Sequence, residues 1–574
     1  MVAYRHGALG RRGPAAIAAM KQKQTVRRKT SPEQAAPPRA GAWIWAGLVL
    51  ALALTAVVRF RLLDIPLERD EGEYAYAGQL ILQGVPPYAS AYNMKMPGVY
   101  AAYAAVMAVF GRSARGIHLG LLAVNLATAY CVFLLGLRLG GARLGLLACA
   151  FFCLLGVGRT ISGFAANAEH FVMLPVVAAM LLLLRTMETR GWRDLLLCAI
   201  LLGTAFLMKQ HAAAFSVFAG LCLVADELSS RPPARRQALA RGLVFAGGLA
   251  LPLLLTGLTL AAAGVFRSFW FWTVVYAAKY VGRMTLSEGL RELKSNFAFV
   301  TLTTAHIWGL GALGLACVWA GPSGRRRGMF LSGFLVFSFL AVCPGLFFRN
   351  HYFLFMLPAV SLLAAAALCD APPLLKRFWP ALPAGALTAL LAALVFCRAL
   401  YAQRGYLFTL SPLQIAAWTY VGNPFLESLE LSKYVQEHSA PSDRIAVLGS
   451  EPQIYFYADR RSATGHIYTY ALMENQPYAL DMQKQMIAQI ESARPEFLIY
   501  VNMPFSWLMR PDSEKLIIRW AESYARRNYR LAGVVDIDPV RGALYRWERD
   551  AAGYAPRSNS FIYVFRKNPA ADKQ

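Results

Sequence analysis

The feature that most constrains this chain is the recurrence of apolar segments before about residue 400. A helix needs roughly 20 apolar residues to cross about 30 Å of hydrocarbon, so the shorter segments must extend into their flanks. The sequence predicts a polytopic α-helical membrane protein with about 11 transmembrane helices, or up to about 13 if the boundaries are drawn differently. The segments lie near 42–60, 117–137, 144–158, 171–185, 194–208, 212–225, 242–264, 298–319, 329–346, 353–369 and 380–400.

Lysines and arginines mark the start of the chain and alternate loops between these segments. Residues 1–40 hold nine of the 58 Lys and Arg, ahead of a first segment that we interpret as an uncleaved signal anchor. Because positive loops stay in the cytoplasm, the pattern predicts a cytoplasmic N-terminus and, for an odd number of spans, an extracytoplasmic C-terminal region. Much of the net charge of +26 is thus an orientation signal, and no nucleic-acid partner is expected. The loop residues are Arg138, Arg143, Arg185, Arg190, Arg193, Arg231, Arg235, Arg236, Arg241, Arg325, Arg326, Arg327, Lys376 and Arg377.

The apolar stretch from Val99 to Phe110 does not fit this scheme. It is short and bracketed by Pro97 and Arg112. Counting it as a span would invert the later charge pattern, so we expect a helix that lies in, or dips into, the outer face.

The composition changes near Tyr401 to a mixture of polar and apolar residues. Strand-like runs at 445–448, 497–501 and 561–565 alternate with helical periodicity near 472–493 and 513–527. We expect a basic cytoplasmic tail at 1–41, a transmembrane domain at 42–400 with a first outer loop at 61–98, and an extracytoplasmic α/β domain at 401–574. The last domain carries no catalytic motif, so acceptor binding or a structural lid is its expected role.

The first outer loop carries an acidic cluster beside aromatic residues. On local chemistry alone, Asp70 is a good N-cap, Glu73 stands at the N3 position of a capping box and Gly84 ends the helix. Composition alone favours this capping interpretation over a catalytic one. The loop contains Asp70-Glu71-Gly72-Glu73-Tyr74-Ala75 and, further on, Asn93-Met94-Lys95-Met96-Pro97-Gly98.

These two strings resemble the first-loop signature of the dolichyl-phosphate-mannose protein mannosyltransferase and aminoarabinose transferase superfamily, whose members are membrane glycosyltransferases of the GT-C fold. The family's Lys-Pro-Pro-like element stands here as Lys95-Met96-Pro97, with one proline replaced. The resemblance extends over the membrane part, to about residue 400.

The resemblance implies transfer of a sugar from a polyprenyl-phosphate-linked donor to a lipid, glycan or protein acceptor. The reaction is expected on the outer face of the bacterial cytoplasmic membrane, with inversion at the anomeric carbon. Such a displacement needs a carboxylate to take the acceptor's proton and cations to stabilise the departing phosphate. Asp70 matches the family's catalytic aspartate, Glu71 its supporting carboxylate, and Lys95 the residue that holds the lipid phosphate.

Further acidic candidates lie at the outer end of an apolar segment. The resemblance implies that Glu169, with His170 and Glu73, positions the acceptor or a metal, and the alternative is an interfacial polar pair that closes a span. The cofactor stays open, because Asp70, Glu71 and Glu169 are able to hold a divalent cation or to work without one.

Two further cations are candidates for binding the donor phosphate. Lys209 lies at the tip of a tight helical hairpin, and Arg349 lies in a turn rich in aromatic residues. The resemblance favours a phosphate role for Lys209, and a guanidinium is able to grip phosphate through two parallel hydrogen bonds. The alternatives are a lysine that snorkels to the interface and an arginine that anchors the turn there.

Two other classes of protein compete with a glycosyltransferase. A flippase or transporter of lipid-linked substrates also needs many spans, but it is expected to carry ionisable residues near span centres, whereas nearly all the charges here lie at span ends. A purely structural envelope protein leaves the loop from Asp70 to Lys95 unexplained.

Overall fold

The structure is a computed structural model that describes residues 41–229, 235–320, 324–376, 378–381 and 383–569. The chain divides into a short unit, residues 1–46, and a main unit, residues 47–574. The contacts discussed below lie in the main unit. Nearly all of the expected basic tail 1–41 falls outside the described residues, as do Arg231 and Arg377.

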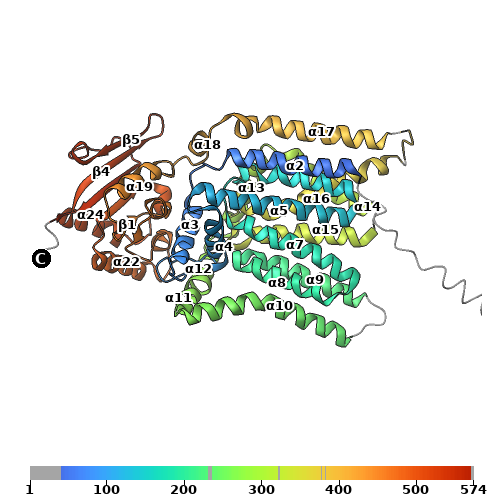
Figure 1. Cartoon of the computed structure of the whole chain (residues 1–574), viewed down its shortest axis with the longest axis horizontal. Coiled ribbons are helices and arrows are strands. Elements are labelled where there is room, and N and C mark those ends of the chain that lie inside the picture. Colours follow the sequence, from blue (N-terminus) through green and yellow to red (C-terminus); the bar gives the residue numbers. More distant parts are fainter. Residues whose placement is uncertain (1–40, 230–234, 321–323, 377, 382, 570–574) are drawn as a thin grey trace, which may run out of the picture. The chain divides into compact units, whose positions relative to one another are not determined.

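Long apolar helices form the part of the chain expected to cross the membrane, and Figure 1 shows them running alongside one another. The most enclosed helix is α16, which packs against α14, α6 and α15 and is buried over most of its length. The helices are α2 (Ala42–Arg61), α5 (Ala114–Gly140), α6 (Ala142–Gly156), α7 (Ala168–Thr189), α8 (Trp192–Met208), α9 (Ala213–Leu228), α10 (Arg235–Ala262), α14 (Ala305–Ala320), α15 (Gly324–Val342), α16 (Leu357–Leu375) and α17 (Ala384–Ala402).

Seven helices of the described chain are long and apolar enough to cross a membrane, or eight if one bent pair counts as a single span. Every one of the eleven predicted segments lies on a helix, but α6 has only 15 residues and α8 only 17. A multi-pass membrane protein is therefore confirmed, and the count of eleven spans stays a prediction.

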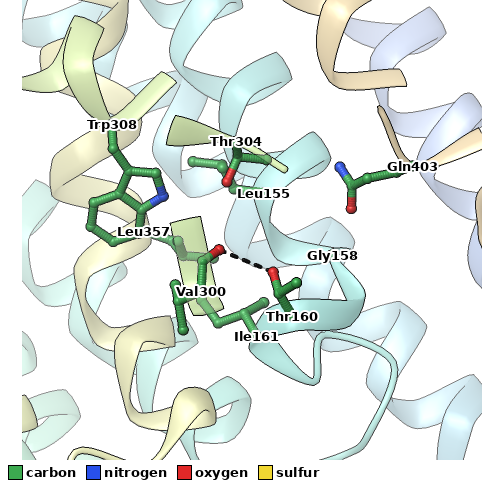
Figure 2. A pocket seen from close by; sticks show the side chains of 9 residues that line it. All are labelled: Leu155, Gly158, Thr160, Ile161, Val300, Thr304, Trp308, Leu357 and Gln403. Carbon is green, nitrogen blue, oxygen red and sulfur yellow. Dashed lines mark hydrogen bonds between the residues drawn. The ribbon is translucent and has the colours of Figure 1, made fainter. Parts of the chain in front are cut away.

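The segment expected at 298–319 is not one straight helix, because the chain bends by 106° between α13 (Leu286–Thr301) and α14, and whether the bent pair forms one span stays a prediction. The N–H of Thr304 donates to the carbonyl of Thr301 at 2.9 Å, so it does not continue the α-helical ladder. The carbonyl of Val300 instead accepts a hydrogen bond from the hydroxyl of Thr160 at 3.0 Å, as Figure 2 shows. The small cavity beside this bond has a volume of about 10 Å³, enough for one water molecule.

Short helices connect the long ones and carry the polar loops. Among them, α3 and α4 lie between α2 and α5 in the sequence and pack against each other. A Cβ on Gly98 would collide with the carbonyl of Leu207, so the start of α4 lies directly against the end of α8. The short elements are α3 (Arg69–Leu82), α4 (Pro97–Phe110), α11 (Phe266–Trp270), α12 (Ala277–Val281), α18 (Pro412–Thr419), the 3₁₀ turns η1 (Arg159–Ile161), η2 (Gln210–Ala212), η4 (Pro344–Leu346) and η5 (Asn350–Met356), and the π-helical η3 (Phe271–Tyr276) and η6 (Gly405–Thr409).

The C-terminal part is built on a six-stranded mixed sheet with the strand order β2-β1-β3-β6-β4-β5. The strand β1 is parallel to β2 and β3, whereas β6 is antiparallel to β3 and β4. The strands are β1 (Arg444–Leu448), β2 (Arg461–Ser462), β3 (Phe497–Asn502), β4 (Tyr529–Asp538), β5 (Gly542–Trp547) and β6 (Phe561–Lys567). The accompanying helices are α19 (Glu427–Glu437), α20 (Gln453–Ala458), α21 (Tyr470–Met473), α22 (Ala479–Ala493), α23 (Pro504–Trp507), α24 (Leu516–Asn528) and the 3₁₀ turn η7 (Glu548–Asp550).

A C-terminal domain with strands and helices is therefore confirmed. The predicted strand runs became β1, β3 and β6, since their continuous apolar residues fill the centre of the sheet. The strands β2, β4 and β5 were missed, because β2 has only two residues and both β4 and β5 carry charged side chains.

Candidate functional site

The helix α3 begins with a capping box, but not the one expected from the sequence. Glu68 is the N-cap and Glu71 stands at N3: the Glu71 N–H donates to Glu68 Oε1, and the Glu68 N–H donates to Glu71 Oε2, each at 3.2 Å. The assignment of Asp70 and Glu73 to the capping box was therefore wrong. The helix ends as expected, with Gly84 just beyond it at a φ of 78°. Because Glu68 and Glu71 cap the helix, the carboxylate of Asp70 is free for other contacts.

The Asp70 carboxylate lies between two side chains from distant parts of the chain. Lys95 donates from Nζ to Oδ2 at 3.0 Å, and the hydroxyl of Tyr468 donates to Oδ1 at 3.2 Å. Burial opposes ionisation of Asp70, but the positive charge of Lys95 overcomes it, with smaller contributions from His351 and Lys209, and the pKa of Asp70 stays below its usual value. The carboxylate is thus ionised at neutral pH and still 17% exposed.

Lys95 is held in place by its own loop and by Glu73. The Tyr88 hydroxyl donates to the Lys95 carbonyl at 2.7 Å. Both carboxylate oxygens of Glu73 accept hydrogen bonds, from Asn93 at 2.7 Å and from Tyr100 at 2.6 Å. Burial raises the pKa of Glu73 to about 7, and the nearby charge of Lys95 limits the rise. Glu73 therefore ties α3 to the loop that carries Lys95.

The Glu71 side chain points away from Asp70 and into the helices. Its Oε1 lies 3.0 Å from Nε2 of His118 and accepts a hydrogen bond from the Ala166 N–H at 2.6 Å. The side chain is fully buried, so its carboxylate is occupied by protein groups. The geometry fits a residue that supports α3, and nothing in the sequence pointed to His118 as its partner.

A second ion pair joins Glu169, at the start of α7, to Lys209, which follows α8. Nε2 of His351 lies 3.9 Å from Glu169 Oε1, and Nζ of Lys209 lies 4.1 Å from the centre of the Tyr352 ring. The amide of Gln210 donates to the carbonyl of Met94 at 3.1 Å, which places the Lys209 turn beside the Lys95 loop. The partly buried Lys95 and the buried Lys209, each paired with a carboxylate, therefore lie on neighbouring loops.

Arg349 and His170, unlike the other predicted site residues, form no ion pair or side-chain hydrogen bond among the described residues. Arg349 is exposed, its guanidinium lies 5.8 Å from the centre of the Phe347 ring, and it forms no ion pair within the described part of the chain. Desolvation opposes the charge of Arg349, but the hydroxyls of Tyr280 and Tyr352 outweigh it and raise the pKa of Arg349. Tyr352 also contacts Lys209, so Arg349 lies at the edge of the cluster formed by Asp70, Lys95, Glu169 and Lys209. His170 is buried, and its Nε2 has no hydrogen-bond partner among the described residues.

The carboxylates considered for a metal do not come together. Glu71 faces His118 and Glu169 faces Lys209, so neither shares a position with Asp70. Across the described ranges, no group of three or more His, Cys, Asp or Glu is arranged to hold a metal ion.

The chain is similar to one protein family by sequence and to solved membrane proteins by structure. Residues 94–259 match the sequence model of the dolichyl-phosphate-mannose-protein mannosyltransferase family. No curated protein matches the chain by sequence. ArnT from Cupriavidus metallidurans, solved with undecaprenyl phosphate, aligns over 91% of this chain and 98% of its own, with a TM-score of 0.59 and 15% identity. The archaeal oligosaccharyltransferase AglB from Archaeoglobus fulgidus, solved with an inhibitory peptide and a dolichol-phosphate, aligns over 92% of this chain and 76% of its own, with a TM-score of 0.50 and 12% identity.

The fold is that of the GT-C membrane glycosyltransferases. The family model matches residues 94–259, less than half of the chain, and this match lies in the part of the chain that carries the long apolar helices. The match supports the resemblance for the string that contains Lys95-Met96-Pro97, and it begins after the string Asp70–Ala75. Lys95, Glu169 and Lys209 lie within the matched residues, whereas Asp70 precedes them and Arg349 follows them.

Proposed function

We propose that this protein transfers a sugar from a polyprenyl-phosphate donor to a hydroxyl or amine of an acceptor, with Asp70 as the general base. The observation that carries the proposal is the position of the Asp70 carboxylate, ionised, partly exposed and 3.0 Å from Lys95. ArnT was solved with undecaprenyl phosphate and AglB with a dolichol-phosphate, which supports a lipid phosphate as the donor's leaving group.

The proposed step is a single displacement at the anomeric carbon of the sugar. The acceptor's oxygen or nitrogen attacks this carbon and its proton passes to Asp70. The bond between the anomeric carbon and the phosphate oxygen breaks, and its electron pair stays on the polyprenyl phosphate. Because attack and departure lie on opposite sides of the carbon, the configuration inverts. Asp70 then releases its proton to water.

The cations are proposed to stabilise the phosphate as it leaves. Lys95 and Lys209 lie on neighbouring loops, each paired with a carboxylate, and Arg349 at the edge of the cluster has no such pair in the described chain. A lipid phosphate that binds Lys95 weakens the attraction between Lys95 and Asp70. The pKa of Asp70 then rises from its low value, so donor binding makes the carboxylate a stronger base.

The other predicted residues receive supporting roles. We infer that Glu71 holds α3 in place through His118 and that Glu73 holds the Lys95 loop through Asn93 and Tyr100. Glu169 keeps Lys209 in position until the phosphate arrives. His170 keeps its proposed role in positioning the acceptor.

We place the reaction on the outer face of the bacterial cytoplasmic membrane, with domains at 1–41, 42–400 and 401–574. The arginine-rich loops support this orientation, because they mark the opposite face as cytoplasmic. A lipid, glycan or protein acceptor reaches the site from the side of the C-terminal domain.

The experiment that tests the proposed function compares the surface glycans and glycolipids of a deletion strain with those of its parent by mass spectrometry. The expected result is one glycan or glycolipid lighter by the mass of a single sugar residue, restored when the gene is returned. An unchanged glycan and glycolipid profile in the deletion strain contradicts the proposal.

A further inference from the structure

The base of the proposed reaction is held by two different parts of the chain. Lys95, from the loop before α4, binds Oδ2 of Asp70, whereas Tyr468, from the segment between β2 and α21, binds Oδ1. The Tyr468 ring packs edge-on against Tyr470, with ring centres 4.8 Å apart. The C-terminal domain therefore contributes a hydrogen-bond donor to the carboxylate.

The segment that carries Tyr468 is fixed to the residue next to Asp70. Arg69 forms a buried ion pair with Glu451 at 3.0 Å and donates from Nε to the Ser450 carbonyl at 2.5 Å. The Thr469 N–H donates to the Ser450 hydroxyl at 3.0 Å. Arg69 and Asp70 are adjacent on α3, so the same short segments of the C-terminal domain determine where both side chains lie.

Close packing leaves this part of the domain little freedom against α3. A Cβ on Gly72 would lie 2.6 Å from the backbone nitrogen of Gln453, so α20 and α3 touch at their backbones. Further along α3, the Ser462 N–H donates to the Tyr76 hydroxyl at 2.8 Å. In the loop after α3, the Tyr92 N–H donates to the Gly465 carbonyl at 2.7 Å. These contacts hold the C-terminal domain against α3 at the place where Tyr468 binds Asp70.

We propose that the C-terminal domain completes the catalytic centre and that Tyr468 is a positioning residue for the Asp70 carboxylate, turning Oδ1 toward the acceptor. This proposal rests on the proposed function. Lys95 stays with Oδ2 and the donor phosphate, so the acceptor's proton passes to the lone pair of Oδ1 that the Tyr468 hydroxyl does not occupy. The Tyr468 hydroxyl fixes the plane of the carboxylate and yields part of its hydrogen bond as the proton arrives. The C-terminal domain thereby sets the orientation of the proposed base toward the acceptor.

The test uses the full-length protein in membranes and measures transfer with the glycan identified by the deletion strain. Tyr468→Phe removes only the hydroxyl, and Tyr470→Phe is the matched control, since its hydroxyl donates to the Phe505 carbonyl instead of to Asp70. We expect Tyr468→Phe to lower kcat by about tenfold or more, as for loss of a hydrogen bond to a charged group, and Tyr470→Phe to leave kcat within about twofold. Binding of undecaprenyl phosphate alone should be equal in both variants.

A second measurement separates positioning from folding. Replacement of Tyr468 by fluorinated tyrosines changes the acidity of the phenol with little change in its shape, and kcat should follow that acidity in a graded series. Wild-type kcat in Tyr468→Phe, or loss of undecaprenyl phosphate binding in it, overturns the proposal. If Tyr468→Phe transfers normally while Asp70→Asn does not, the proposed function stands without this role for the domain. Absence of transfer by the wild type overturns both.

Discussion

Lys95 and Asp70 lie 25 residues apart in sequence and form an ion pair of 3.0 Å between the loop before α4 and the first turn of α3. The pair brings the proposed base and the proposed phosphate-binding cation into contact, and the proposed transfer needs both a base for the acceptor's proton and a cation for the departing phosphate. The same pair explains how a partly buried carboxylate stays ionised. Under the proposed function, it also couples donor binding to the strength of the base.

Removal of the Lys95 charge is expected to weaken donor binding and to change the base. In Lys95→Gln, the affinity for undecaprenyl phosphate should fall by roughly tenfold to a hundredfold, as for loss of a hydrogen bond to a charged group. The pKa of Asp70 should rise, because the main charge that lowers it is gone, so the acid limb of any residual kcat profile moves to higher pH. Isothermal titration with undecaprenyl phosphate and a pH–rate profile check the two effects.

The control for this variant is Lys279→Gln, at an exposed lysine of α12. It should bind undecaprenyl phosphate as the wild type does. Equal losses of affinity in the two variants contradict a specific phosphate role for Lys95.

Glu73 is expected to make stability depend on pH near neutrality. Its pKa is raised to about 7 from the ordinary value of 4.5, so the folded protein binds this proton more tightly than the unfolded chain does. Its contribution is complete below about pH 4.5 and is lost as the pH rises toward 7, by roughly 3 kcal/mol at most. Glu73→Gln, which resembles the protonated form, should show a flatter decline of Tm between pH 5 and 8 than the wild type. A wild-type Tm that rises with pH over this range, with no difference from the variant, contradicts the burial of Glu73.

His118 is expected to act on stability through Glu71. In His118→Ala, the Glu71 carboxylate keeps the Ala166 N–H but loses its buried side-chain partner, at a cost of about 1–3 kcal/mol. The variant should unfold at lower temperature, while the folded fraction keeps specific activity within a few fold, because Glu71 does not face Asp70. Thermal unfolding and transfer, both normalised to folded protein, measure the two quantities. Loss of transfer at unchanged Tm would assign Glu71 to the chemistry itself.

Much of the fold was predictable because hydrophobic patterning is local. Each apolar segment lies on a helix, and the continuous apolar runs at 445–448, 497–501 and 561–565 lie on strands. The resemblance of the two first-loop strings to a family signature, and not composition, singled out Asp70 and Lys95. Apolar periodicity depends on residues close in sequence, which is why the helices and these strands could be predicted from the chain alone.

The rest depends on contacts that sequence spacing does not encode. The N-cap of α3 is Glu68 and not Asp70 as expected. Its capping partner Glu71 is also bound by His118 and by the Ala166 backbone, which are both far along the chain. The chain bends after Thr301, and beside the bend the hydroxyl of Thr160, 140 residues away in sequence, donates to the Val300 carbonyl. Tyr468 lies 398 residues from Asp70, and only the packing of the C-terminal domain on α3 brings the two together.

The central claim is that Asp70 is the base, and the most direct measurement is sugar transfer by purified Asp70→Asn. The matched control is Asp64→Asn, which removes an exposed carboxylate paired with Arg115 at 2.9 Å. We expect Asp70→Asn to lose at least about a hundredfold in kcat, the lower range of a general base's contribution, while it still binds undecaprenyl phosphate and Asp64→Asn transfers normally. Transfer by Asp70→Asn at near the wild-type rate would contradict the claim, and would leave Asp70 as a carboxylate that only neutralises Lys95.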